Sequence, residues 1–67
     1  MNAGANASLA RAQELSERLR VKLEGLDRLA EAGDVDAAVD DLAEIAEIAK
    51  EIEAEIQRAR ASADAGA

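Results

Sequence analysis

Gly33 and Asp34 separate two long stretches in which apolar residues recur every three or four positions. Glycine readily adopts the left-handed backbone conformation that closes a helix, and an aspartate side chain accepts hydrogen bonds from the free amides that open the next one. The sequence therefore predicts a helix over about residues 8–32, a turn at these two residues, and a second helix over about residues 35–61.

Composition leaves little room for any other fold. The 67-residue chain is rich in Ala, Leu, Glu and Arg, which favour helix, and it contains no Phe, Tyr, Trp or Pro. We therefore expect an all-α fold, an antiparallel two-helix hairpin that forms a single domain over residues 8–61. Residues 1–7 and 62–67 carry small and polar side chains without an apolar period, and we expect them to be flexible tails.

The first helical stretch contains a coiled-coil seam, meaning the line of residues that faces a neighbouring helix. Its positions alternate steps of three and four: Ala12, Leu15, Leu19, Lys22, Leu26 and Leu29. Leu9 and Leu23 widen this apolar face. Lys22 interrupts it, either with its stem along the seam and its ammonium in water, or as a polar residue that fixes the register. Gly25 costs about 1 kcal/mol relative to Ala, and is either tolerated or allows close approach of another backbone.

The second helical stretch contains a seam with the same spacing: Val35, Ala38, Leu42, Ile45, Ala49, Ile52, Ile56 and Ala59. Ile48 lies beside this line and broadens it. Leucine side chains of the first helix would face alternating large and small side chains of the second, which lets two antiparallel helices approach closely. The two stretches are therefore expected to pair along their seams.

A lone hairpin covers each of its helices on one side only, and so short a chain seldom holds its fold with one core. We expect the face that carries Leu9, Leu23, Ile48 and Ile52 to pack against a second hairpin or a different helical protein. Two copies would form a homodimeric four-helix bundle, a coiled-coil assembly. The apolar residues expected at these interfaces are Leu15, Leu19, Leu23, Leu26, Leu29, Leu42, Ile45, Ile48, Ile52 and Ile56.

The net charge of -7 is unevenly distributed along the chain. Five bases balance five acids in residues 8–32, whereas residues 34–55 carry nine acids and one base. This acidic half repels phosphate backbones and anionic membranes, so the charge disfavours nucleic acid and favours a basic or apolar protein partner. Residues 1–7 lack the basic start and apolar run of a secretion signal, and a cytoplasmic protein is expected. The excess of Arg over Lys and the abundance of Ala are typical of bacteria with GC-rich genomes.

Catalytic and metal-binding residue types are scarce. The chain has no His and no Cys, which removes the usual general base, the commonest metal ligand and any disulfide. Carboxylates are dense on the second helix, at Glu44, Glu47, Glu51 and Glu55. A metal site in a helical bundle needs acids that point into the core, whereas the predicted seam is aliphatic, so we expect these acids to form a solvated face. We expect no enzyme activity, no cofactor and no metal centre.

In its length, its tight turn at Gly33 and Asp34 and its paired heptads, the chain resembles the Rop family of plasmid-copy-number hairpins. That resemblance implies a hairpin that dimerises into a four-helix bundle and binds RNA, but it includes no residue motif and carries over no site residues. RNA binding by this chain would use the bases of the first helix, Arg11, Arg18, Arg20 and Arg28. The residues themselves favour a non-enzymatic interaction module, either a self-associating hairpin or a small helical subunit or adaptor. An acidic inhibitor or decoy of a basic, nucleic-acid-binding protein is the alternative, and a Rop-like RNA-binding regulator is the third.

Overall fold

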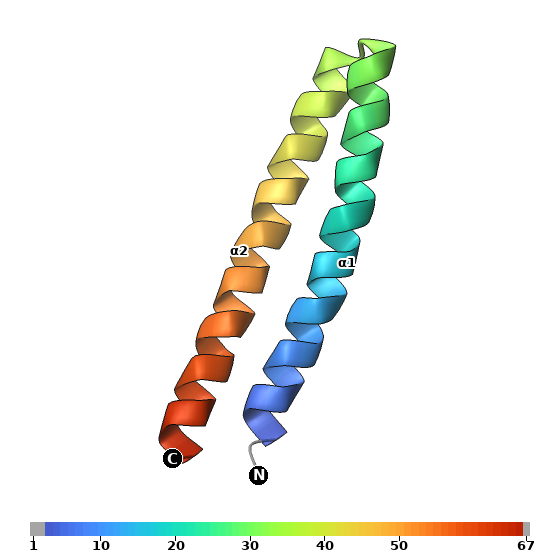
Figure 1. Ribbon diagram of the computed structural model, residues 1–67. Helices are drawn as coiled ribbons and strands as arrows, with labels where there is room; N and C mark the ends of the chain where they lie inside the picture. The colour runs from blue at the N-terminus through green and yellow to red at the C-terminus, as the bar shows by residue number, and fades with distance from the viewer. Residues whose placement is uncertain (1–2, 67) are drawn as a thin grey trace.

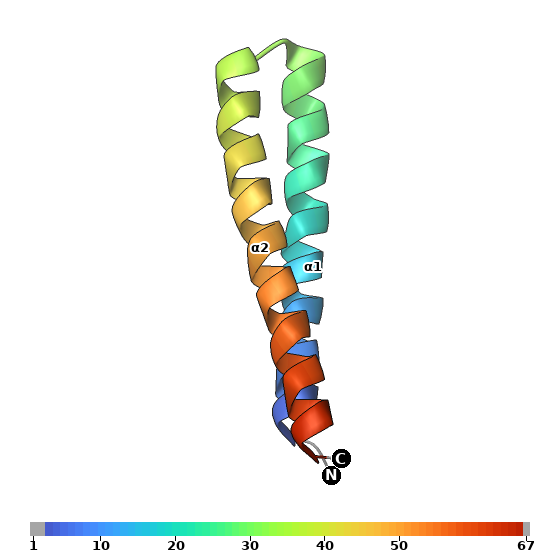
Figure 2. The ribbon, with the colours of Figure 1, turned by 90° about the vertical axis from the view of Figure 1, so that its left-hand side faces the viewer.

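The described part of the chain, residues 3–66 of a computed structural model, is a hairpin of two α-helices (Figure 1). Helix α1 (Ala3–Ala32) and helix α2 (Val35–Gly66) run antiparallel and stay adjacent in both views (Figure 2). The molecule is a rod with extents of 51 × 14 × 9 Å. Ala3 and Gly66 lie at one end of the rod and the turn lies at the other.

The turn falls at Gly33 and Asp34, where the sequence places it. Gly33 has a φ of 75°, and the amides of Gly33 and Asp34 donate to the carbonyls of Ala30 and Leu29 at 3.1 and 3.0 Å. These bonds satisfy carbonyls at the end of α1 in a Schellman arrangement. Asp34 then caps α2, because its Oδ1 accepts a hydrogen bond of 3.2 Å from the Ala37 amide.

Both helices extend beyond the predicted bounds. Helix α1 begins at Ala3 and α2 ends at Gly66, so residues 3–7 and 62–66 of the expected tails are helical, while residues 1–2 and 67 lie outside the described residues. Small seam residues lie in the added turns, since Ala5 is buried and Ser62 is half-buried. Alanine has the highest helix propensity, but its low hydrophobicity leaves no apolar period to detect.

The seam of α1 is the predicted one, continued toward the N-terminus. Its buried and half-buried positions are Ala5, Ser8, Ala12, Leu15, Leu19, Lys22, Leu26 and Leu29. The seam of α2 differs from the prediction. It consists of Ala38, Asp41, Ile45, Ile48, Ile52, Glu55, Ala59 and Ser62, all buried or half-buried.

Helix α2 is therefore rotated by about 50°, half the angle between successive residues of a helix, from the orientation that its apolar pattern favoured. Asp41, Ile48 and Glu55 face α1, whereas Leu42 and Ile56, predicted to lie in the hairpin seam, are exposed, as are Val35 and Ala49. The observed orientation pairs charges across the two helices. Lys22 and Arg11 occupy or border its seam, and this orientation brings Asp41 and Glu55 to them.

Candidate functional site

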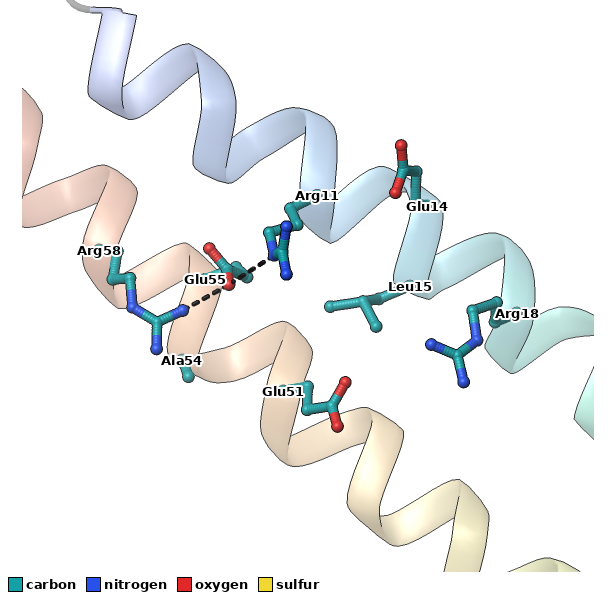
Figure 3. A pocket seen from close by; sticks show the side chains of 8 residues that line it. All are labelled: Arg11, Glu14, Leu15, Arg18, Glu51, Ala54, Glu55 and Arg58. Carbon is teal, nitrogen blue, oxygen red and sulfur yellow. Dashed lines mark hydrogen bonds and ion pairs between the residues drawn. The ribbon is translucent and has the colours of Figure 1, made fainter.

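One side of the hairpin carries ion pairs between the helices. Near the open end of the rod, α1 and α2 form a groove of about 420 Å³ lined by Arg11, Glu14, Leu15, Arg18, Glu51, Ala54, Glu55 and Arg58 (Figure 3). Glu55 is buried, and its Oε2 accepts a hydrogen bond from Arg58 and lies 3.4 Å from Arg11 Nε. Three arginines and three glutamates balance in formal charge, so the groove offers no net charge to a ligand. We call this side, together with Lys22, Asp41 and Glu44, the charged flank.

Lys22 forms the second ion-pair cluster of the charged flank. Its ammonium donates to Glu44 and to Asp41 Oδ1, the latter at 3.3 Å, and these bonds raise the pKa of Lys22. The ammonium therefore meets two carboxylates of α2, rather than water alone. The pairs Lys22–Asp41 and Arg11–Glu55 each connect one position of α1 to one position of α2. Such pairs favour a single register between the two helices.

Gly25 lies on the same flank, close to Asp41. An added Cβ would lie 3.7 Å from Asp41 Oδ2, an ordinary contact, and no backbone from α2 approaches this position within the described hairpin. Within the hairpin, this glycine is accordingly tolerated rather than required by a close backbone approach.

The ion pair of Lys22 predicts an alkaline loss of stability. The pKa of Lys22 is raised above its ordinary 10.5 in the folded chain, so its contribution is complete below that value and disappears as the pH rises through the higher folded pKa. Thermal melts followed by circular dichroism should show a larger loss of Tm for the wild type than for Lys22→Met between about pH 9.5 and 12. Lys22→Arg, which stays charged in this range, should also lack the loss. Equal declines in all three proteins would contradict the prediction.

The opposite side of the hairpin is apolar and uncovered. A shallow groove beside the turn is lined by Leu29 and Ala30 of α1 and by Val35, Val39 and Leu42 of α2, among others, so these parts of the two helices share one side. Seven-residue steps continue this side along α1 from Ala30 through Leu23 and Ser16 to Leu9. On α2 they lead from Leu42 through Ala49 to Ile56. We define the apolar flank by its large members, which are 42–69% exposed: Leu9, Leu23, Val35, Val39, Leu42 and Ile56.

On α2 the apolar flank forms a second seam. Residues 35, 39, 42, 46, 49, 53 and 56 again alternate steps of four and three, and all except Glu53 are apolar. Among residues 3–66, Val21 is the one strongly exposed large apolar side chain away from this flank, and it lies beside Lys22 and Arg18. A stripe with heptad spacing is the surface that a further helix would cover.

The structure divides the ten predicted interface residues into two groups. Seven lie between α1 and α2 and are buried or half-buried: Leu15, Leu19, Leu26, Leu29, Ile45, Ile48 and Ile52. Leu23, Leu42 and Ile56 lie on the apolar flank. Of the four residues expected to meet a partner, Leu9 and Leu23 are exposed, but Ile48 and Ile52 are turned toward α1.

Sequence reasoning did not single out Val35 and Val39 as outward-facing partner residues. The available signal was the second heptad frame on α2, displaced by one residue from the seam that packs against α1. The apolar pattern did not separate this frame from the seam, because it favoured the predicted seam, in which Asp41 and Glu55 do not face α1. In the structure both carboxylates meet bases of α1.

The acidic side chains of α2 are less uniformly solvated than expected. Of the four glutamates predicted to form a solvated face, Glu44, Glu47 and Glu51 are exposed, with Glu44 bonded to Lys22, whereas Glu55 is buried in the seam. In residues 3–66 no group of three or more His, Cys, Asp or Glu is placed to hold a metal ion. Neither α1 nor α2, as described, is long and apolar enough to cross a bilayer.

The four arginines named for RNA binding serve different local roles. Arg11 pairs with Glu55, and Arg20 bonds to Glu17 and to Glu24. The hydrogen bond from Arg20 lowers the pKa of Glu17. Arg18 lines the groove of the charged flank and Arg28 lies nearer the turn. Comparison with protein-family models, curated proteins and solved structures finds no match to this chain.

Proposed function

We propose that this chain is a non-enzymatic protein–protein interaction module that self-associates through the apolar flank. Two hairpins would pack these flanks together as a four-helix bundle. The observation that carries the proposal is the apolar flank, where six large side chains along one side of the rod are 42–69% exposed; on α2 they are joined by Ala46 and Ala49 and interrupted by Glu53. Removing such a stripe from water is favourable, and monomeric proteins rarely leave a large one uncovered.

A second copy fits this stripe better than an unrelated helix. A two-fold interface covers the same stripe on both chains at once, so neither copy keeps an uncovered flank. The heptad spacing on α2 provides regular knobs and holes for a helix of the same pitch. Ala46 and Ala49, in the middle of the stripe, are small enough for another helix to approach closely.

Sedimentation equilibrium tests the proposal directly. Detection must avoid 280 nm absorbance, because the chain contains neither Trp nor Tyr. We expect a mass of about 14 kDa, twice the 7.0 kDa of one chain, over some part of the range from about 1 to 100 µM. A mass of one chain throughout this range would contradict self-association.

The acidic decoy is the second candidate, supported by the nine acids of residues 34–55. Several of them already pair with bases of the same chain, including Asp41, Glu44 and Glu55. A decoy should bind a basic protein with an affinity that falls steeply as salt rises from about 50 to 200 mM, because exposed charges are then screened. Association through the apolar flank should hold or tighten over the same range.

A further inference from the structure

A charge gradient runs along the rod. Because the helices are antiparallel, distant parts of the sequence share a level, as the contacts of Lys22 with Asp41 and of Arg11 with Glu55 show. The third of the rod next to the turn, residues 24–43, carries seven acids and one base. The opposite third, residues 3–13 with 54–66, carries three bases and two acids.

We infer that the second copy lies head to tail on the first, with the two turns at opposite ends of the bundle, and that the charge gradient selects this orientation. The inference rests on the self-association proposed above. The apolar flank alone does not choose an orientation, because it extends from Leu9 and Ile56 at one end to Val35 at the other. Two copies would cover one another in either direction.

The charges distinguish the two directions. Packed helices lie about 8–10 Å apart, which is close to the Debye length of about 8 Å at physiological salt, so charges on neighbouring hairpins are only partly screened from one another. With the turns side by side, residues 24–43 of one copy, of formal charge -6, would lie beside the same residues of the other copy. With the copies head to tail, residues 24–43 of each copy would lie beside the open end of the other, whose formal charge is +1. The middle thirds face one another in both directions and favour neither.

Spin labels can read the orientation, because the chain has no native cysteine. Ala32→Cys places a label beside the turn and Ala61→Cys places one near the open end, both at exposed positions away from the apolar flank. Head to tail, two Ala32→Cys labels should lie far apart, at a distance approaching the 51 Å length of the rod. An equal mixture of the two labelled proteins should add a turn-to-end distance of about 25 Å or less.

The outcomes separate the two proposals. A distance below about 25 Å between two Ala32→Cys labels would overturn the orientation and leave self-association standing. No distance between chains, together with the mass of a single chain, would overturn both. The head-to-tail distances are the supporting result.

A matched pair of neutralised variants tests the cause. Glu31→Gln, Asp36→Asn and Asp40→Asn together remove three acids near the turn, and should add a population with the short Ala32→Cys distance. Glu14→Gln, Glu47→Gln and Glu51→Gln remove three acids from the middle third, and should keep the long distance alone. Identical distances in both variants would show that something other than the gradient sets the orientation.

Discussion

A Leu42→Glu variant is expected to sediment as a single chain at concentrations where the wild type is dimeric. Leu42 is 51% exposed and lies between Val39 and Ala46 in the second seam of α2. In the proposed bundle a glutamate there would lose water without gaining a partner, and the dissociation constant should rise by about 100-fold or more. Sedimentation equilibrium of both proteins at matched concentrations measures the change.

Val21→Glu is the matched control for this experiment. Val21 is 54% exposed, comparable to Leu42, but lies away from the apolar flank beside Lys22 and Arg18. Both substitutions add one negative charge to the chain, so a difference between them reports position rather than net charge. Unchanged association in Leu42→Glu, or equal loss in both variants, would contradict the assignment of the apolar flank as the interface.

Ile48→Ala is expected to lower the free energy of unfolding by about 2–4 kcal/mol, the usual loss for a buried isoleucine. Ile48 is 5% exposed and faces α1 between two charged seam residues, Asp41 and Glu55. Small domains have stabilities of only a few kcal/mol, so this loss removes a large share of the total. Urea unfolding followed by circular dichroism, at concentrations where the chain is monomeric, provides the measurement.

Two comparisons make the Ile48 result specific. Val21→Ala, at an exposed position, should change the free energy of unfolding by no more than about 0.5 kcal/mol. Ile56→Ala should cost the monomer less than Ile48→Ala, because Ile56 does not face α1. A larger loss for Ile56→Ala would mean that α2 meets α1 with the frame that contains Leu42, Ala49 and Ile56.

The apolar pattern of α2 predicted that the helix forms and packs against α1, but not its rotation about its own axis. Both frames share Ala38, Ile45, Ile52 and Ala59, so the pattern on these residues cannot separate them. The remaining positions are Asp, Ile, Glu and Ser in the observed frame and Val, Leu, Ala and Ile in the predicted one, and hydropathy favours the predicted one. The first is the frame in the structure, where the carboxylates are not isolated but meet Lys22, Arg11 and Arg58.

Other features were easier to predict because the local chemistry left no alternative. Gly33 and Asp34 fixed the turn through positive φ and helix capping, and the leucines of α1 defined its seam. The helix ends were underestimated, since alanine supports a helix without marking an apolar face. Leu9 and Leu23 were identified as outward-facing from their place beside the α1 seam, whereas the α2 half of the apolar flank depended on the rotation.

The placement of Ala3 and Gly66 at one end of the rod has a geometric consequence (Figure 2). Whatever is fused to either end of this hairpin would leave from the same pole. Two copies paired in opposite directions would then hold their attachments at opposite poles, separated by about the 51 Å extent of the rod. Such a pair would hold the fused groups of its two copies at a fixed separation, whereas copies pointing the same way would bring those groups together.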